Sequence, residues 1–251
     1  MFEILLIPAF KDNYIWLLVR DGRAAVVDPG DAAPVMERLE TLQLKLEAIL
    51  VTHHHPDHQG GVGALVERWQ PRVYGPAAES ITGCSDPLVG GETIDVLGQS
   101  VDVLPVGGHT RGHLAYHVPG ALFCGDTLFG AGCGRLFEGT PAQMCGSLAR
   151  IAAMPDDTLI YCAHEYTEAN LRFAVAVEPE NPAIRERIAR VAQLRAAGQS
   201  SVPSSLREEK DTNPFLRCAE PAVIAAAQAQ GAGNTALVPV FAAIRGWRNS
   251  F

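Results

Sequence analysis

All eight histidines of the chain lie between positions 53 and 164, and four of them fall within seven residues. These seven residues, Thr52 to His58, read T-H-H-H-P-D-H and follow an apolar stretch that ends at Val51. Imidazole and carboxylate groups at this density are typical of sites for borderline divalent ions such as Zn²⁺. Structural zinc sites usually contain cysteine, and this segment has none, so the pattern favours a catalytic metal site.

The spacing within the segment predicts donors for two ions. In an extended chain, successive side chains alternate, so His53 and His55 point to one side and His54 to the other. Pro56 favours the start of a helix, and Asp57 and His58 in its first turn then project in a second direction. A surface histidine tract, or histidines of the core, fits less well with the preceding strand and the embedded carboxylate.

The segment resembles the H-x-H-x-D-H signature of the metallo-β-lactamase superfamily, and further stretches match that superfamily's remaining ligands in order: Gly108-His109-Thr110, Gly125-Asp126-Thr127-Leu128 and Tyr161 to Tyr166 with His164. The resemblance implies an αββα sandwich with a binuclear metal centre. It assigns His53, His55 and His109 to the first metal, Asp57, His58 and His164 to the second, and Asp126 to the bridge between them.

Three stretches resemble the glyoxalase II (hydroxyacylglutathione hydrolase) family more specifically: Gly132 to Thr140, His164 to Thr167 and Arg207 to Phe215. This resemblance implies a smaller C-terminal all-helical domain and a glutathione thioester as substrate. It assigns the glutathione contacts to Arg135, Tyr166, Arg207 and Lys210. Some members have Lys at position 135 and Tyr at 137, whereas here Arg135 keeps the charge with a different geometry and Phe137 offers no hydroxyl.

The implied reaction is hydrolysis of S-(2-hydroxyacyl)glutathione, with S-D-lactoylglutathione converted to D-lactate and glutathione in the detoxification of methylglyoxal. Two divalent ions about 3.5–4 Å apart lower the pKa of a bridging water toward 7, so the resemblance implies attack of a bridging hydroxide on the thioester carbonyl. Asp57 and Asp126 are the expected catalytic carboxylates. Zn is the expected metal, and the donor set also accepts Fe or Mn.

The other histidines are expected to support the site without binding metal. His54 and His113 are expected to form hydrogen bonds behind the ligands, and His117 is expected to be structural. Asp28, in the sequence V-V-D-P-G, has two equal interpretations. It either orients a ligand histidine through the ring N–H or forms a turn at the end of a strand.

The elements that must position these residues follow from hydrophobic patterning. Short apolar runs bounded by turn signals predict strands at 3–8, 14–20, 24–28, 48–52, 101–106, 114–118, 121–125 and 158–162. Helices are expected at 32–44, 62–69 and 141–154. This alternation predicts an α/β sandwich of sheets covered by helices, in which the ligands follow the ends of strands.

From residue 171 to 251 the pattern is helical. Ile184, Ile188, Val191 and Leu194 are spaced for one apolar helix face that ends before Gly198, and more helices are expected at 221–230 and 239–248. We therefore predict two domains, a catalytic domain at 1–170 and a helical glutathione-binding domain at 171–251.

Charge divides along the same boundary. Residues 1–170 contain 10 basic and 21 acidic residues, a net charge of −11, whereas residues 171–251 contain 10 and 7, a net charge of +3. Arg207 and Lys210 have the i, i+3 spacing that would let a helix direct both toward one anion. The competing interpretation of Lys210 is a solvated charge paired with Glu208 and Glu209.

Composition limits the possible partners and location. The 251 residues are 47% hydrophobic, enough for a large core, and carry a net charge of −8 with no run of basic residues. Nucleic acid and anionic membranes are therefore not expected as partners. Six cysteines without a C-x-x-C pair, and a first segment unlike a signal peptide, favour a reduced cytoplasmic protein, expected to be a monomer.

Other functions fit the residues less well. A persulfide dioxygenase of the same fold uses one iron and would have no use for Asp57, His164 or the C-terminal domain. A β-lactamase has no use for the basic C-terminal stretch, and a nuclease would need more positive charge near the metals. A non-catalytic metal-binding module predicts degraded ligands, whereas all seven are intact here.

Overall fold

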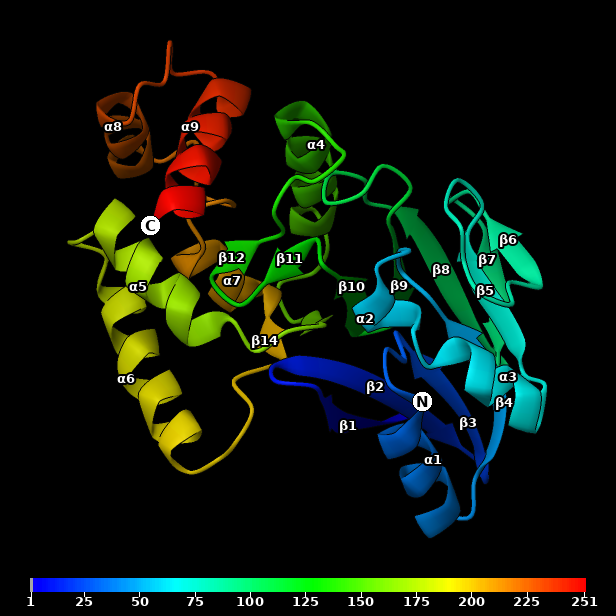
Figure 1. Ribbon diagram of the computed structural model, residues 1–251. Helices are drawn as coiled ribbons and strands as arrows, with labels where there is room; N and C mark the ends of the chain where they lie inside the picture. The colour runs from blue at the N-terminus through cyan, green and yellow to red at the C-terminus, as the bar shows by residue number, and fades with distance from the viewer. Residues whose placement is uncertain (1) are drawn as a thin grey trace. The chain divides into compact units, whose positions relative to one another are not determined.

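The computed structural model describes residues 2–251, which form two compact units (Figure 1). The first unit comprises Met1–Pro105, of which residues 2–105 are described, and Arg111–Gly125. The second comprises Val106–Thr110 and Asp126–Phe251. The proposed metal ligands are divided between the units, with four in the first and three in the second.

The first sheet of the first unit has six strands in sequence order: β1 (Glu3–Ala9), β2 (Asn13–Arg20), β3 (Arg23–Val27), β4 (Lys45–Leu50), β5 (Arg72–Pro76) and β6 (Asp86–Leu88). β1 to β3 pair antiparallel through tight turns, whereas β3 to β6 pair parallel. Parallel neighbours need crossover connections, here α1 (Ala32–Thr41) before β4 and α2 (Pro56–Gln59) with α3 (Val62–Trp69) before β5.

The crossover helices cover one face of this sheet, because each has one apolar side. Val35 and Leu39 of α1 and Leu65 of α3 are fully buried in one cluster with the sheet residues Leu17 and Ile49. Burial of such a side chain contributes about 1.5–3 kcal/mol relative to exposure. This core holds the end of β4, and hence the histidine segment that follows it.

A second group of strands in this unit pairs antiparallel in the order β7 (Thr93–Val96), β8 (Gln99–Pro105), β9 (Leu114–Val118) and β10 (Ala121–Gly125). Tyr116 of β9 is completely buried, and its hydroxyl donates a hydrogen bond to the carbonyl of Val51 at 2.8 Å. Burial raises the pKa of Tyr116 well above its ordinary value. The neutral hydroxyl thus fixes the backbone immediately before the histidines.

The second unit contains the hairpin β11 (Leu128–Phe129) and β12 (Gly132–Cys133), the strand pair β13 (Leu159–Cys162) and β14 (Ser204–Ser205), and six helices: α4 (Pro141–Ala152), α5 (Thr167–Val177), α6 (Pro182–Ala196), α7 (Leu206–Thr212), α8 (Pro221–Ala229) and α9 (Leu237–Ser250). α5 and α6 lie side by side, as do α8 and α9 (Figure 1). Leu171 and Ala174 of α5 pack against Ile184 and Val191 of α6.

Most expected elements are confirmed, including the helix at Val62–Trp69 and the helical face of α6. The expectation of a purely helical C-terminal part needs one correction, because Ser204 and Ser205 form the short strand β14 on β13. The second compact unit begins at Asp126, apart from Val106–Thr110, and within it α4 packs against α9. The domain boundary near residue 170 stays a prediction, based on the helical pattern of the sequence that follows it.

Two further observations concern the whole described chain. None of the helices within residues 2–251 is long and apolar enough to cross a membrane. All six cysteines are free thiols, five of them buried, as expected for a protein that is not a disulfide scaffold.

Candidate functional site

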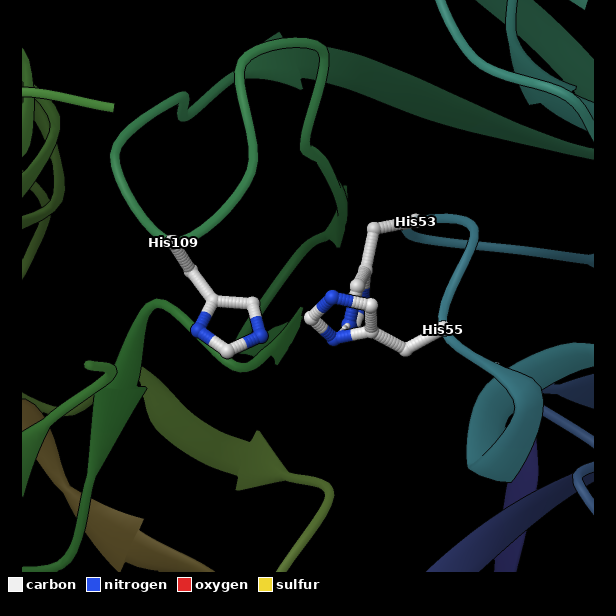
Figure 2. A group of neighbouring side chains, drawn as sticks. All are labelled: His53, His55 and His109. Atoms are coloured by element: carbon white, nitrogen blue, oxygen red, sulfur yellow. Dashed lines mark hydrogen bonds between the residues drawn. The ribbon is translucent and has the colours of Figure 1, made fainter. Parts of the chain in front are cut away.

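The first pair of candidate ligands lies on the segment between β4 and α2. His53 is fully buried, and its Nε2 atom lies 3.0 Å from Nδ1 of His55. Figure 2 shows the two imidazoles close together on this segment. The alternation expected for an extended chain is confirmed, and two ring nitrogens converge where one ion could bind both.

Asp57 and His58 lie in α2, which begins at Pro56 as expected. Oδ2 of Asp57 lies 3.5 Å from Nε2 of the fully buried His58, and it also accepts a hydrogen bond from the side-chain amide of Asn13 at 3.0 Å. Asn13 is the residue at the start of β2 and is itself buried. The carboxylate is thus held in place from a second element of the same unit.

Asp28 contacts this group as its first interpretation predicts, and its backbone also forms the turn after β3 that the second predicts. Its carboxylate accepts hydrogen bonds from the backbone N–H and the hydroxyl of Thr52, both at 2.7 Å, and lies 3.0 Å from Nδ1 of His58. A carboxylate partner places the imidazole proton on Nδ1 and leaves the Nε2 lone pair for a metal. Asp28 has a φ of +51°, an uncommon conformation for a residue other than glycine.

Of the remaining histidines of this unit, His54 makes the hydrogen bond expected for it, whereas the hydrogen bond expected for His113 stays a prediction. Nδ1 of His54 lies 2.8 Å from the buried carboxylate of Glu79, which also accepts from the backbone N–H groups of His54 and Gly112. His113 stacks on His53, with ring centroids 4.6 Å apart. His117 instead faces Asp102 at 3.5 Å, and its structural role stays a prediction.

In the second unit, His109, Asp126 and His164 converge by themselves. Nε2 of His109 lies 3.4 Å from one carboxylate oxygen of Asp126, and Nε2 of His164 lies 3.4 Å from the other. All three residues are buried. A carboxylate with one oxygen toward each imidazole has the arrangement required of a ligand that bridges two ions.

The backbone holds His109 in the orientation that a metal ligand needs. Nδ1 of His109 lies 2.7 Å from the carbonyl of Arg135, which places the ring proton on Nδ1 and directs the lone pair of Nε2 toward the Asp126 side. Figure 2 shows the side chain of His109 at the end of its loop. Gly134 lets the backbone next to Arg135 approach Asp126 closely, because a Cβ at position 134 would lie 2.0 Å from the carbonyl oxygen of Asp126.

The two sets of donors, one in each unit, consist of residue types that bind divalent ions. Each set combines imidazole nitrogens with a carboxylate and lacks thiolates, as in catalytic zinc sites. His58 and His109 each have the second ring nitrogen held by a hydrogen-bond acceptor, as metal-binding histidines usually do. The same donor types accept Zn, Fe and Mn, so the geometry does not select among these metals.

A cavity of about 230 Å³ in the second unit is lined by Phe129, Cys133, Arg135, Tyr166, Asn170, Arg245, Arg248 and Asn249. Three of these residues are arginines and none is acidic. The ring of Tyr166 stacks on the metal-ligand candidate His164 at 4.7 Å with an interplanar angle of 5°. The cavity is therefore cationic and borders the ligand set of its own unit.

The arginines of this cavity have only neutral partners within residues 2–251. Arg245 donates to the carbonyl of Cys133 at 2.8 Å and to the amide oxygen of Asn249 at 3.1 Å, and Arg248 donates to the amide oxygen of Asn170 at 3.3 Å. Burial, together with the nearby charge of Arg245, lowers the pKa of Arg248. An anion entering this cavity would find positive charge that no carboxylate neutralises.

Of the four predicted glutathione contacts, the structure brings Arg135 and Tyr166 to this cavity. Arg207 and Lys210 lie on α7 and face the same way, as their spacing predicts, but both bind Asp156, at 3.3 and 2.5 Å. The hydrogen bond from Lys210 lowers the pKa of Asp156. Their charge is already balanced, and they do not line the cavity.

Sequence reasoning did not identify Arg245 and Arg248. They share the i, i+3 spacing of Arg207 and Lys210 and lie on α9 in the sequence I-R-G-W-R. The signal that could have indicated them is an arginine at a buried position of an apolar helix, since Arg245 is only 8% exposed. Phe137, by contrast, is 60% exposed, with its ring 5.3 Å from that of His109.

Two family models together match nearly the whole chain. Residues 10–164 match the metallo-β-lactamase superfamily, and residues 165–251 match the hydroxyacylglutathione hydrolase C-terminus. A hydroxyacylglutathione hydrolase of Dechloromonas aromatica is 66% identical over all of both chains, and one of Aeromonas salmonicida is 53% identical over all of both chains.

Solved structures support the fold. ETHE1 from Myxococcus xanthus is 26% identical, with a TM-score of 0.66 over 86% of this chain and 84% of that one. The BLEG-1 B3 metallo-β-lactamase is 22% identical, with a TM-score of 0.67 over 85% of this chain and 99% of the other. The predicted α/β metallo-β-lactamase sandwich is thereby confirmed, with a C-terminal helical region after it.

Proposed function

Because the chain belongs to the hydroxyacylglutathione hydrolase family of the metallo-β-lactamase superfamily, we propose that it hydrolyses the thioester of S-(2-hydroxyacyl)glutathione. The products are a 2-hydroxy acid and glutathione, with D-lactate formed from S-D-lactoylglutathione in methylglyoxal detoxification. The observation that carries the proposal is the cationic cavity beside His164, because glutathione presents carboxylates that such a cavity can bind.

Two divalent ions are part of this proposal, with Zn as the expected metal. His53, His55 and His109 would hold one ion, and Asp57, His58 and His164 the other, with Asp126 as the bridge. When bound, such ions supply a nucleophile from water at neutral pH and polarise the carbonyl under attack. The chain prepares its ligands for them: Asp28 keeps the proton on Nδ1 of His58, and the Arg135 carbonyl keeps it on Nδ1 of His109.

The cavity supplies substrate binding and orientation. We propose that Arg135, Arg245 and Arg248 bind the glutathione carboxylates and that Tyr166 guides the peptide toward the ligands. Arg207 and Lys210 remain an alternative clamp on the basis of the family resemblance alone. The geometry favours the arginines on α9, because their positive charge is not balanced by a carboxylate.

The decisive experiment is hydrolysis of S-D-lactoylglutathione by protein of measured metal content. Asp126→Ala should lower kcat by at least about 100-fold, since loss of even an outer partner of a metal ligand costs 10- to 100-fold. Full thioesterase activity in chelator-treated protein would overturn the proposed mechanism. Oxygen uptake with glutathione persulfide, without thioester hydrolysis, would instead favour the persulfide dioxygenase alternative.

The proposal also includes the cellular location and the oligomeric state of the protein. Six free thiols support a reducing compartment, such as the cytoplasm, and we propose a monomer. Light scattering on the metal-loaded protein tests the second point, and a mass near twice the 26.8 kDa of one chain would contradict it.

A further inference from the structure

The hairpin β11–β12 forms one wall of the cationic cavity through Phe129 and Cys133. It is only two residues long on each side and turns through Ala131, which has a φ of +53°. A hairpin this short is not stable by itself, so its shape must be imposed by its surroundings.

Side chains from the C-terminal helices bind the backbone of this hairpin. The buried amide of Asn213 donates to the carbonyls of Gly132 at 2.9 Å and Phe129 at 3.3 Å, and the buried carboxylate of Glu209 accepts from the N–H of Ala131 at 2.8 Å. Asn170 donates to the carbonyl of Gly130 at 3.0 Å. The turn is therefore held by residues that follow it in the chain by as many as 84 positions.

Glu209 is the centre of this arrangement and is completely buried. Its carboxylate also accepts from Nη2 of Arg187 at 2.5 Å, from the hydroxyl of Ser204 at 2.7 Å and from the amide of Asn213 at 3.0 Å. A buried pair of charges contributes little net stability compared with apolar residues of the same size, so stability alone does not explain it. Such pairs can instead specify one arrangement of the groups around them.

The hairpin in turn sets two groups that face the cavity. The carbonyl of Cys133 receives a hydrogen bond from Arg245 at 2.8 Å, and the ring of Phe129 packs edge-on against Tyr166 with centroids 5.2 Å apart. A small displacement of the turn would move both groups. Misplacement of a positioning group by about 1 Å can cost roughly 100-fold in rate.

We propose that Glu209, with Arg187 and Asn213, is a positioning residue for glutathione recognition, although none of the three lines the cavity. It acts through the hairpin, which places the guanidinium of Arg245 and the ring of Tyr166. This inference rests on the proposed function, since it assumes that the cavity receives the glutathione part of the substrate.

The test compares two thioesters in the metal-loaded full-length enzyme. S-D-lactoylglutathione uses the cavity, whereas the D-lactoyl thioester of N-acetylcysteamine lacks the glutathione carboxylates. For Glu209→Gln we expect KM for the glutathione thioester to rise about tenfold with kcat nearly unchanged, because binding remote from the reacting bond is lost. The kcat/KM for the truncated thioester should stay within about twofold.

In Glu209→Gln, Arg187 remains buried without its carboxylate partner, which could prevent folding. A second variant keeps the test valid in that case. Arg187→Gln with Glu209→Gln removes both buried charges and should give the same rise in KM. The matched control is the double variant Arg217→Gln with Glu178→Gln. These two residues form another ion pair of the same unit, with Nε of Arg217 2.8 Å from the Glu178 carboxylate, and neither binds the hairpin. It should lower Tm without changing KM.

The possible results distinguish a failure of the positioning role of Glu209 from a failure of the proposed function of the cavity. If wild-type enzyme does not prefer the glutathione thioester over the truncated one, the proposed cavity function fails, and this inference fails with it. If wild type shows the preference and the Glu209 variants keep the same KM at a lower Tm, only the positioning role is overturned. An equal loss of kcat on both thioesters would also overturn it.

Discussion

Two arginine-containing pairs of equal spacing provide a direct test of where glutathione binds. Arg245 and Arg248 lie on α9 in the cationic cavity, and Arg207 and Lys210 lie on α7 beside Asp156. Replacing either pair by glutamine removes two positive charges from the same unit. We expect only the α9 pair to be essential for substrate binding.

The magnitude follows from burial and from the partners of each pair. A hydrogen bond to a charged group contributes about 1.5–3 kcal/mol, and we take the lower value for each arginine because the cavity is open to solvent. The sum of about 3 kcal/mol corresponds to roughly 100-fold in kcat/KM, since about 1.4 kcal/mol is tenfold. The side chains of Arg207 and Lys210 are 65% and 30% exposed, and screened charges of this kind change binding by about twofold.

Steady-state kinetics with S-D-lactoylglutathione distinguishes the pairs. Arg245→Gln with Arg248→Gln should raise KM and leave kcat almost unchanged, because the carboxylates bind away from the thioester. Arg207→Gln with Lys210→Gln should leave both constants nearly at the wild-type values. The reasoning is refuted if the α7 pair raises KM as much as the α9 pair, or if the α9 pair has no effect.

Three further predictions concern metal retention and pH. Asp28→Asn should weaken metal binding by about 10- to 100-fold because it disturbs the proton on Nδ1 of His58; competition with a chromophoric chelator measures this, and an unchanged affinity would contradict the role of Asp28. Glu79→Gln should weaken metal binding in the same assay by a smaller factor. An affinity equal to that of wild type would show that the histidine segment does not need the hydrogen bonds of Glu79. Burial raises the pKa of Cys133 to about 11 and that of Cys162 to about 12. As the pH rises above about 8.5, these thiols ionise in the unfolded chain before they ionise in the folded protein. The free energy of unfolding should therefore be constant below about pH 8.5 and fall as the pH rises toward 11. Thermal unfolding from pH 8 to 11 tests this, and alanine variants of both cysteines that show the same decline as wild type would disprove it.

Much of the fold could be predicted because local pattern and burial agree. The helix at Val62–Trp69 has the predicted bounds, since Val62 and Leu65 recur on a buried face and Gln70 ends it with a left-handed conformation. The strands β5 to β7 were not predicted, because their apolar residues are few and the segments are three to five residues long. The two-residue β14 exists only through its pairing with β13, a long-range contact without a local signal.

The convergence of His53 with His55, and of Asp57 with His58, could be predicted because their spacing reflects local geometry at the end of a strand. His109, Asp126 and His164 were expected from the family resemblance. The lining of the cationic cavity could not be predicted, because two pairs of basic residues have the same i, i+3 spacing and only tertiary contacts distinguish them. Asp156 lies 51 residues before Arg207 and neutralises it, whereas the carbonyl of Cys133 lies 112 residues before Arg245 and leaves its charge in place. Glu209, interpreted from sequence as a surface partner of Lys210, is instead completely buried with Arg187.

Arg135 connects the two functions of the second unit through different atoms. Its carbonyl receives the hydrogen bond of His109, and its guanidinium belongs to the cavity wall. A shift of this one residue would alter both places, so we expect ligand binding in the cavity and metal binding by His109 to be coupled. Such coupling is reciprocal: the factor by which bound metal changes glutathione binding is the factor by which glutathione changes metal binding. We therefore expect glutathione, the proposed product, to change the affinity of this unit for the metal.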